Sequence, residues 1–296
     1  MQVRDAVYGQ LLTQQWRRGR CACVGLDPEM GSVRLALGEQ DVERALTRFN
    51  CEIVDATADL VCAYKPNIAF YERWGAPGIS ALRRTITHIN AVAPEVAVIV
   101  DAKRGDIAST NLAYRDALFG YLGADAVTVQ PYLGVDALRP FLDTRTKGVI
   151  VLCRTSNPGS GELQDLQTGG EPLYMRVARL AAYDWNEHGN CSVLVGGTHP
   201  EQVGEVRRIA PHLPILVAGV GHQGGPVGHI IRAGLHQGGG LIISSSRSII
   251  EADPGPRFAQ GARTATMALV DEIRAAVTTM TQPGDAVRPA ENDPRS

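Results

Sequence analysis

The sequence lacks the features that mark membrane, secreted or nucleic-acid-binding proteins. No apolar run reaches the roughly 18 residues that cross a membrane, and the first residues, Met1 to Asp5, carry no apolar stretch of a signal peptide. The formal net charge is -2 and the basic residues are scattered, so neither nucleic acid nor an anionic membrane surface is expected as a partner. We therefore expect a cytoplasmic protein that binds small molecules.

Patterns typical of metal and redox sites are also missing. The six cysteines include no C-x-x-C pair, and most of them lie inside apolar runs, so we expect buried, reduced thiols. The seven histidines include no H-E-x-x-H or similar ligand spacing. The sequence therefore predicts no metal site.

Lysine is scarce. Of the 29 Lys and Arg residues, only three are lysine: Lys65, Lys103 and Lys147. Because Arg keeps its proton near neutral pH and Lys can release one, a chain that otherwise uses Arg can retain Lys where a proton moves. Lys65 and Lys103 are therefore candidate functional residues, although base composition and chance explain the count equally well.

Short apolar runs alternate with amphipathic stretches along the whole chain, which has enough residues for one large core. The order is strand then helix, repeated eight times, which predicts an α/β fold of the (β/α)8 TIM-barrel class, with an open doubly wound sheet as the alternative. We expect a single domain over 1–281. The predicted strands are 21–26, 60–64, 96–100, 126–129, 148–153, 192–196, 214–218 and 240–244.

Helical patterns fill the intervals between these strands. An opening helix over about 3–18 is expected to cover the bottom of the barrel, and residues 282–296, which have little to bury, are expected to form a disordered tail. The other predicted helices are 41–58, 78–92, 110–121, 134–142, 171–187, 200–209, 226–234 and 257–279.

Polar residues follow several of the predicted strands, where barrel enzymes carry their chemistry. The densest group begins with Asp101 and Lys103, which at strand spacing project into the barrel mouth. Gly105 is expected to let the chain turn and deliver Asp106, so that two carboxylates flank one ammonium. A salt bridge that merely ties a loop is the alternative for an isolated D-x-K.

A G-x-G-x-x-G string, Gly219 to Gly224, follows the seventh strand. A dinucleotide site would need an acidic residue about 20 positions further on, and that region has none. Phosphate binding fits better, because barrels often hold phosphate with the loops after strands seven and eight. Arg247, after the eighth strand, can supply paired donors to a dianion.

The motif Asp101-x-Lys103-x-x-Asp106 resembles the signature of the orotidine 5'-phosphate decarboxylase superfamily, and the string DAKRGDI resembles the decarboxylases themselves, in their long-chain, type 2 branch. The resemblance extends over roughly residues 20–250. Asp27 in GLDPE matches the family's ribose-contacting Asp, and Lys65 matches its strand-two lysine. Together with the motif, these two residues complete the family's charged set.

The resemblance implies decarboxylation of orotidine 5'-phosphate to UMP, the final step of de novo pyrimidine synthesis, without metal or organic cofactor. It implies that Lys103 stabilises the C6 carbanion and protonates it, with Asp101 near the substrate carboxylate. Ser156 matches the family's base-reading position, and three residues are expected at the phosphate: Gln223, Ser246 and Arg247. Ser246 stands where relatives have Gly, and Ala218 where many have Pro.

In the family, residues that match Asp106, Ile107 and Thr110 reach into the partner's site, so the resemblance implies a homodimer with shared active sites. One alternative is a sugar-phosphate decarboxylase or aldolase of the same superfamily, which shares D-x-K-x-x-D but uses Mg2+. Ser156, Gln223 and Lys65 argue against it. Another is a catalytically silent nucleotide-binding barrel, which the intact charged set disfavours.

Overall fold

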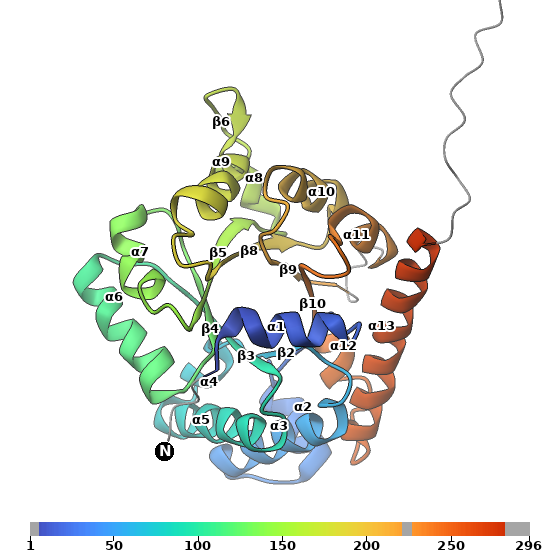
Figure 1. The fold of residues 1–296 in the computed structure, drawn as a ribbon. Coiled ribbons are helices and arrows are strands. Elements are labelled where there is room, and N and C mark those ends of the chain that lie inside the picture. The colour runs from blue at the N-terminus through green and yellow to red at the C-terminus, as the bar shows by residue number, and fades with distance from the viewer. Residues whose placement is uncertain (1–5, 221–226, 282–296) are drawn as a thin grey trace, which may run out of the picture.

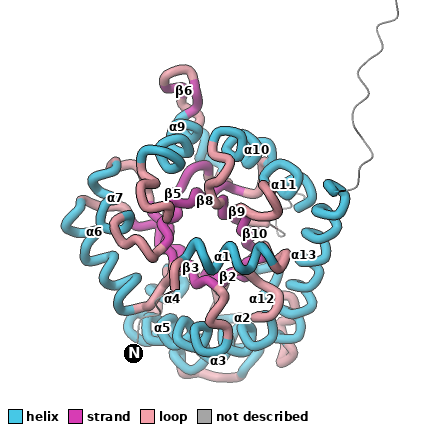
Figure 2. Tube along the Cα trace, in the orientation of Figure 1, coloured by secondary structure: helices cyan, strands magenta, loops and turns pink. Residues whose placement is uncertain are grey.

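A computed structural model describes residues 6–220 and 227–281 of the chain. Eight parallel strands close into a barrel in the order β1-β10-β9-β8-β5-β4-β3-β2, and helices surround the ring (Figures 1 and 2). This confirms the predicted (β/α)8 fold. The strands are β1 (Ala22–Gly25), β2 (Ala63–Lys65), β3 (Ala97–Arg104), β4 (Ala126–Val129), β5 (Gly148–Arg154), β8 (Cys191–Gly196), β9 (Ile215–Ala218) and β10 (Leu241–Ser245).

The longer helices lie where the amphipathic patterns predicted them. Two end in π-helical turns, Asp116–Tyr121 after α6 and Leu180–Asp184 after α9. The helices are α1 (Tyr8–Arg17), α3 (Val42–Thr57), α5 (Gly75–Val92), α6 (Ala108–Arg115), α7 (Val135–Leu142), α9 (Leu173–Arg179), α10 (Pro200–Ile209), α11 (Val227–Gly234) and α13 (Phe258–Thr281). None of the described helices is both long and apolar enough to cross a membrane.

Several short elements were not predicted. A small antiparallel hairpin of β6 (Gln167–Thr168) and β7 (Glu171–Pro172) projects from the barrel between β5 and α9 (Figure 1). Its strands are too short and too polar for hydrophobic alternation to reveal them. The other unpredicted elements are α2 (Met30–Leu37), α4 (Ala69–Glu72), α8 (Gly161–Gln164), α12 (Arg247–Ile250) and a 3-10 turn over Pro158–Ser160.

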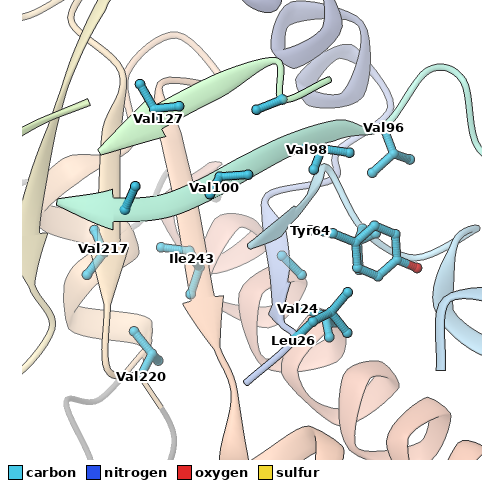
Figure 3. Packing of buried hydrophobic residues seen from close by; sticks show 14 of the residues in the cluster. Val24, Leu26, Tyr64, Val96, Val98, Val100, Val127, Val217, Val220 and Ile243 are labelled. Atoms are coloured by element: carbon cyan, nitrogen blue, oxygen red, sulfur yellow. The ribbon is translucent and has the colours of Figure 1, made fainter. Parts of the chain in front are cut away.

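Alternation along the strands builds two apolar clusters. Side chains such as Val98, Val127 and Ile243 point outward and pack beneath the helices (Figure 3). Side chains of the opposite parity, such as Ile99 and Ile242, fill the barrel interior. Because successive residues of a strand face opposite sides, residues two positions beyond the interior cluster also point inward, and they include the polar residues Lys65, Asp101 and Thr128.

Helix α1 closes the end of the barrel at which the strands begin. Tyr8, Leu11 and Leu12 belong to the interior cluster, and a Cβ at Gly148 would lie 2.3 Å from the Tyr8 ring. The Trp16 indole donates to the Leu241 carbonyl at 2.8 Å. Glycine at position 148 is therefore needed so that Tyr8 can occupy the floor of the barrel, and the prediction that the opening helix covers the bottom is confirmed.

The third lysine also lies at this closed end. Lys147 and Asp125, in the loops that precede β5 and β4, form an ion pair of 3.6 Å. Both side chains are at most 5% exposed, and the Asp125 carboxylate also accepts from the Val98 amide. All six cysteines are free, and all except the half-buried Cys51 are buried, as predicted.

Candidate active site

The three strand-end residues that the sequence singled out meet at the open end of the barrel. Lys65 ends β2, and its ammonium lies 3.2 Å from one oxygen of Asp101 on β3. Lys103 lies 2.7 Å from the other oxygen of the same carboxylate. Lys65 and Asp101 are almost fully buried, whereas the Lys103 side chain is 41% exposed. One buried carboxylate therefore bridges two ammonium groups, and Lys103 is the more exposed of the two lysines.

Burial and charge act in opposite directions on the two buried groups. Burial disfavours the charged form of Lys65, but Asp27 and Asp101 outweigh it and raise the pKa of Lys65 above its usual value. Burial likewise disfavours the Asp101 carboxylate, but Lys65 and Lys103 outweigh it and hold the pKa of Asp101 well below its usual range. Both groups are therefore charged at neutral pH.

A cavity of about 520 Å³ opens beside this cluster. Lys65 lines one part of it together with Asp27, whose carboxylate accepts from the Asn67 amide at 3.0 Å. Ser246 and Arg247 line another part, and the buried Ser246 hydroxyl has no hydrogen-bond partner in the described chain. Four predicted site residues thus share one cavity, and two of them, Lys65 and Arg247, bring positive charge to it.

Ser246 fits the cavity because of Gly25, which ends β1. A Cβ at Gly25 would lie 2.6 Å from the Cβ of Ser246, so any larger residue at position 25 would displace the serine. The glycine at the end of β1 therefore leaves the space that Ser246 occupies after the neighbouring strand β10.

The predicted turn at Gly105 is wrong in its details. The residue with left-handed backbone is Lys103 (φ 46°), which costs a non-glycine residue on the order of 1 kcal/mol. Gly105 is required for a different reason, because a Cβ there would lie 2.8 Å from the Cβ of Gln130. Lys103 rather than Gly105 thus gives the loop its special conformation.

Asp106 also differs from the prediction. Its carboxylate accepts from the Ile107 amide, and its backbone is held by Asn111. Within residues 6–220 and 227–281, no hydrogen bond or ion pair joins Asp106 to Lys103. Inside one chain, a single carboxylate is therefore shared by two ammonium groups, rather than a single ammonium by two carboxylates.

The loop after β5 is fixed by a buried arginine. The Arg154 guanidinium donates to the Thr155 carbonyl, the Gln164 amide oxygen, the Ser160 hydroxyl and the Asp165 carboxylate. Beside these contacts lies Ser156, whose exposed side chain packs close to the glycines that end or follow β8 and β9, Gly196 and Gly219. The predicted base-contacting serine is thus at the barrel mouth.

The remaining predicted residues lie elsewhere. Ile107 precedes α6 and is 61% exposed, and Thr110, within α6, is half-buried. Neither lines the cavity of its own chain, and Asp101, Lys103 and Ser156 do not line it either. Gln223 lies outside the described residues.

The sequence analysis missed one uncharged residue that contacts the charged cluster. Thr128, on β4, is fully buried, and its hydroxyl donates to Asp101 at 2.8 Å. The available signal was that Thr128 is the one polar side chain in an otherwise apolar strand. Five further cavity-lining residues with polar or aromatic side chains were also missed: Glu29, Phe70, Ser244, Ser248 and Glu251.

The family comparison adds to this geometry. The model for the Orotidine 5'-phosphate decarboxylase / HUMPS family matches residues 22–261. The chain is 48% identical over 272 residues to an Orotidine 5'-phosphate decarboxylase of Roseiflexus castenholzii, covering 91% of this chain and 98% of that protein.

Solved structures agree with the sequence comparison. The structure of Leishmania donovani OMP decarboxylase matches with a TM-score of 0.79 and 36% identity, covering 91% of this chain and 98% of that one. Leishmania donovani UMP synthase matches with a TM-score of 0.81 and 38% identity, covering 92% of this chain. The chain spans 56% of that longer protein.

Proposed function

The chain belongs to the Orotidine 5'-phosphate decarboxylase / HUMPS family and decarboxylates orotidine 5'-phosphate to UMP in pyrimidine synthesis, and we propose from this premise how its residues divide the work. Lys103 acts on the pyrimidine ring, and Asp27 and Arg247 hold the rest of the nucleotide. The observation that carries this assignment is the exposed Lys103 ammonium, 2.7 Å from the buried Asp101 carboxylate. The catalytic domain extends over 1–281.

The reaction breaks the bond between C6 and the carboxylate carbon. Carbon dioxide leaves and the bonding electron pair stays on C6, where the Lys103 ammonium stabilises the developing negative charge. Lys103 then donates a proton to C6, which gives UMP and a neutral amine that solvent reprotonates. Arginine could not take this role because it holds its proton too tightly. The reaction needs neither a metal nor an organic cofactor.

Asp101 and Lys65 support this step from beneath. Asp101 is bonded to both lysines, so it aims the Lys103 ammonium, and it lies near the substrate carboxylate. Lys65, buried and paired with Asp101, keeps that carboxylate charged. The ion pairs among these three residues thus hold the Lys103 ammonium in place when charge develops on C6.

Contacts far from C6 anchor the nucleotide. Arg247 and Ser246 line the part of the cavity that we assign to the phosphate. Gln223, which lies outside the described residues, is proposed as a further phosphate ligand. Asp27 contacts the ribose, and Ser156 hydrogen-bonds the base. Binding energy from the phosphate helps to order the charged cluster around the ring, so it contributes to turnover as well as to affinity.

A homodimer with shared active sites is part of the proposal. Ile107 is exposed, and Tyr132, in the neighbouring loop after β4, is 82% exposed. The two loops touch through Gly105 and Gln130. A second copy that covers these apolar side chains would bring Asp106, Ile107 and Thr110 to its partner's site. The proposed location of the protein is the cytoplasm.

The first experiment is loss of orotidine 5'-phosphate absorbance on adding purified protein in EDTA. Rapid loss with the wild type and none with Lys103→Ala supports the metal-free reaction and the role of Lys103. No loss with either protein would favour a sugar-phosphate enzyme of the superfamily or a silent barrel. UMP binding without carbon dioxide release would favour a silent nucleotide-binding barrel.

A further inference from the structure

Strands β3 and β4 fall out of register at the charged cluster. Val100 pairs with Val127, but the next pair is Arg104 with Val129. Asp101, Ala102 and Lys103 therefore stand opposite the single residue Thr128. A bulge of this kind re-aims side chains and interrupts the backbone hydrogen bonds between strands. Asp101, which is buried, and Lys103, which is partly exposed, both lie within this irregularity.

Thr128 bonds to both ends of the bulge. Its hydroxyl accepts from the Lys103 backbone amide at 2.9 Å and donates to the Asp101 carboxylate at 2.8 Å. The Lys103 ammonium binds the same oxygen of Asp101, Oδ1, at 2.7 Å. The backbone and the side chain of Lys103 are thus tied to one centre, made of a single hydroxyl and a single carboxylate oxygen.

The conformation that these bonds hold is unusual. Lys103 has φ 46°, a region that residues with a Cβ rarely adopt unless surrounding contacts impose it. On its C-terminal side, the Gln130 amide donates to the Arg104 carbonyl at 2.7 Å. On its N-terminal side, the Asp101 amide donates to the Pro66 carbonyl at 2.9 Å. Between these two anchors, the amide of Lys103 itself is bonded to the Thr128 side chain.

We propose that Thr128 is a positioning residue for the decarboxylation, holding the bulged backbone so that the Lys103 ammonium is aimed from Asp101 toward the substrate. This inference rests on the role proposed for Lys103. Thr128 is fully buried, unlike the partly exposed Lys103, so we expect that it does not touch the nucleotide. Its loss therefore acts on turnover and leaves nucleotide affinity nearly unchanged.

The test is a series at position 128 graded by hydrogen-bonding ability. Thr128→Val keeps the shape and removes the hydroxyl, Thr128→Ser keeps the hydroxyl, and Thr128→Cys replaces it by a weak donor. For Thr128→Val we expect kcat to fall roughly 100-fold, the loss typical of a catalytic group misplaced by about 1 Å. We expect Thr128→Ser to restore kcat nearly to the wild-type value and Thr128→Cys to be intermediate.

Two further measurements separate positioning from a structural defect. The dissociation constant for UMP, measured by calorimetry, is expected to stay near the wild-type value across the series. Thr266→Val is the matched control, because Thr266 is also fully buried but bonds a helical carbonyl in α13. We expect its kcat to be unchanged.

Wild-type kcat in Thr128→Val overturns the proposal, as does a loss of kcat that serine does not rescue. If Thr128→Val does not fold, folded Thr128→Cys decides the matter: a reduced kcat supports positioning, and a wild-type kcat overturns it. Lys103→Ala is measured in the same assay. Activity lost there but kept in Thr128→Val overturns the role of Thr128 alone, whereas activity kept in Lys103→Ala overturns the proposed mechanism.

Discussion

The two ends of the barrel each hold a buried lysine-aspartate pair. The pairs differ in the number of lysines that contact the aspartate and in whether a cavity lies beside them. At the closed end, Lys147 and Asp125 match one charge with one charge beneath α1. At the open end, Asp101 serves both Lys65 and Lys103, and a cavity lies beside them. In barrel enzymes, the end at which strands finish carries the chemistry and the opposite end carries stability. We therefore expect the lysine-aspartate pair at the closed end to serve stability and the cluster at the open end to serve catalysis.

The first way to test this contrast is to make one substitution at both ends. We expect Lys103→Ala to lower kcat by roughly 10⁴-fold, because an electrostatic stabiliser and an acid are lost together. Its free energy of unfolding should change by less than about 1 kcal/mol, since the side chain is partly exposed. Decarboxylation assays and urea unfolding measure the two quantities.

Lys147→Ala is the matched variant and should behave in the opposite way. It leaves the Asp125 carboxylate buried without its lysine, so we expect the free energy of unfolding to fall by about 3–5 kcal/mol. The kcat per folded molecule should be unchanged. A large loss of kcat in folded Lys147→Ala would refute the division between the two ends.

Asp101→Asn is expected to damage stability and activity together. It leaves the buried Lys65 ammonium beside a neutral amide, which should cost about 3–5 kcal/mol at neutral pH. Because the folded pKa of Asp101 is lowered, its contribution to stability is present above the ordinary Asp pKa of about 4 and is lost as pH falls toward the folded pKa. The difference in unfolding free energy between wild type and variant should therefore narrow when urea unfolding is measured from pH 7 down to pH 3.

The control for this variant is Asp125→Asn at the closed end. It should lower stability while the kcat per folded molecule is kept. If the gap between wild type and Asp101→Asn stayed constant down to pH 3, the carboxylate of Asp101 would not be the group that stabilises the cluster.

Arg247→Ala is expected to have the smallest effect. It tests whether phosphate binding is coupled to the charged cluster. A hydrogen bond to a charged group is worth about 1.5–3 kcal/mol, so kcat/KM should fall roughly 10–100-fold. Part of that loss should appear in kcat, because phosphate binding helps to order the cluster. The exposed Arg17 of α1, replaced by Ala, serves as control. A raised KM with unchanged kcat would contradict the coupling.

The sequence was most informative for elements in which buried apolar residues recur in a regular pattern. Each barrel strand is a run of apolar residues between turns, so all eight could be placed from hydrophobicity alone, and Lys65, Asp101 and Lys103 followed because they stand at strand ends. The hairpin of β6 and β7 could not be placed, because two-residue strands bury almost nothing and leave no periodic pattern.

The backbone conformation of the site also could not be predicted from the sequence. Spacing suggested that Gly105 makes the turn, since glycine tolerates left-handed backbone, yet Lys103 adopts it. No residue preference predicts this, because the conformation is imposed by Thr128 and by the register shift between β3 and β4. Such contacts depend on neighbouring strands and become visible only in three dimensions.

Helix α1 closes one end of the barrel and so limits the routes by which products can leave the active site. The Tyr8 ring fills the space beside Gly148, and its hydroxyl lies 3.5 Å from the buried Ser192 hydroxyl, so side chains fill the closed end of the barrel. Because the closed end is filled, we expect carbon dioxide released beside Asp101 to leave through the same open end of the barrel at which the nucleotide enters. Carbon dioxide, UMP and the next orotidine 5'-phosphate would then use the same opening, so both products must leave before the next substrate binds.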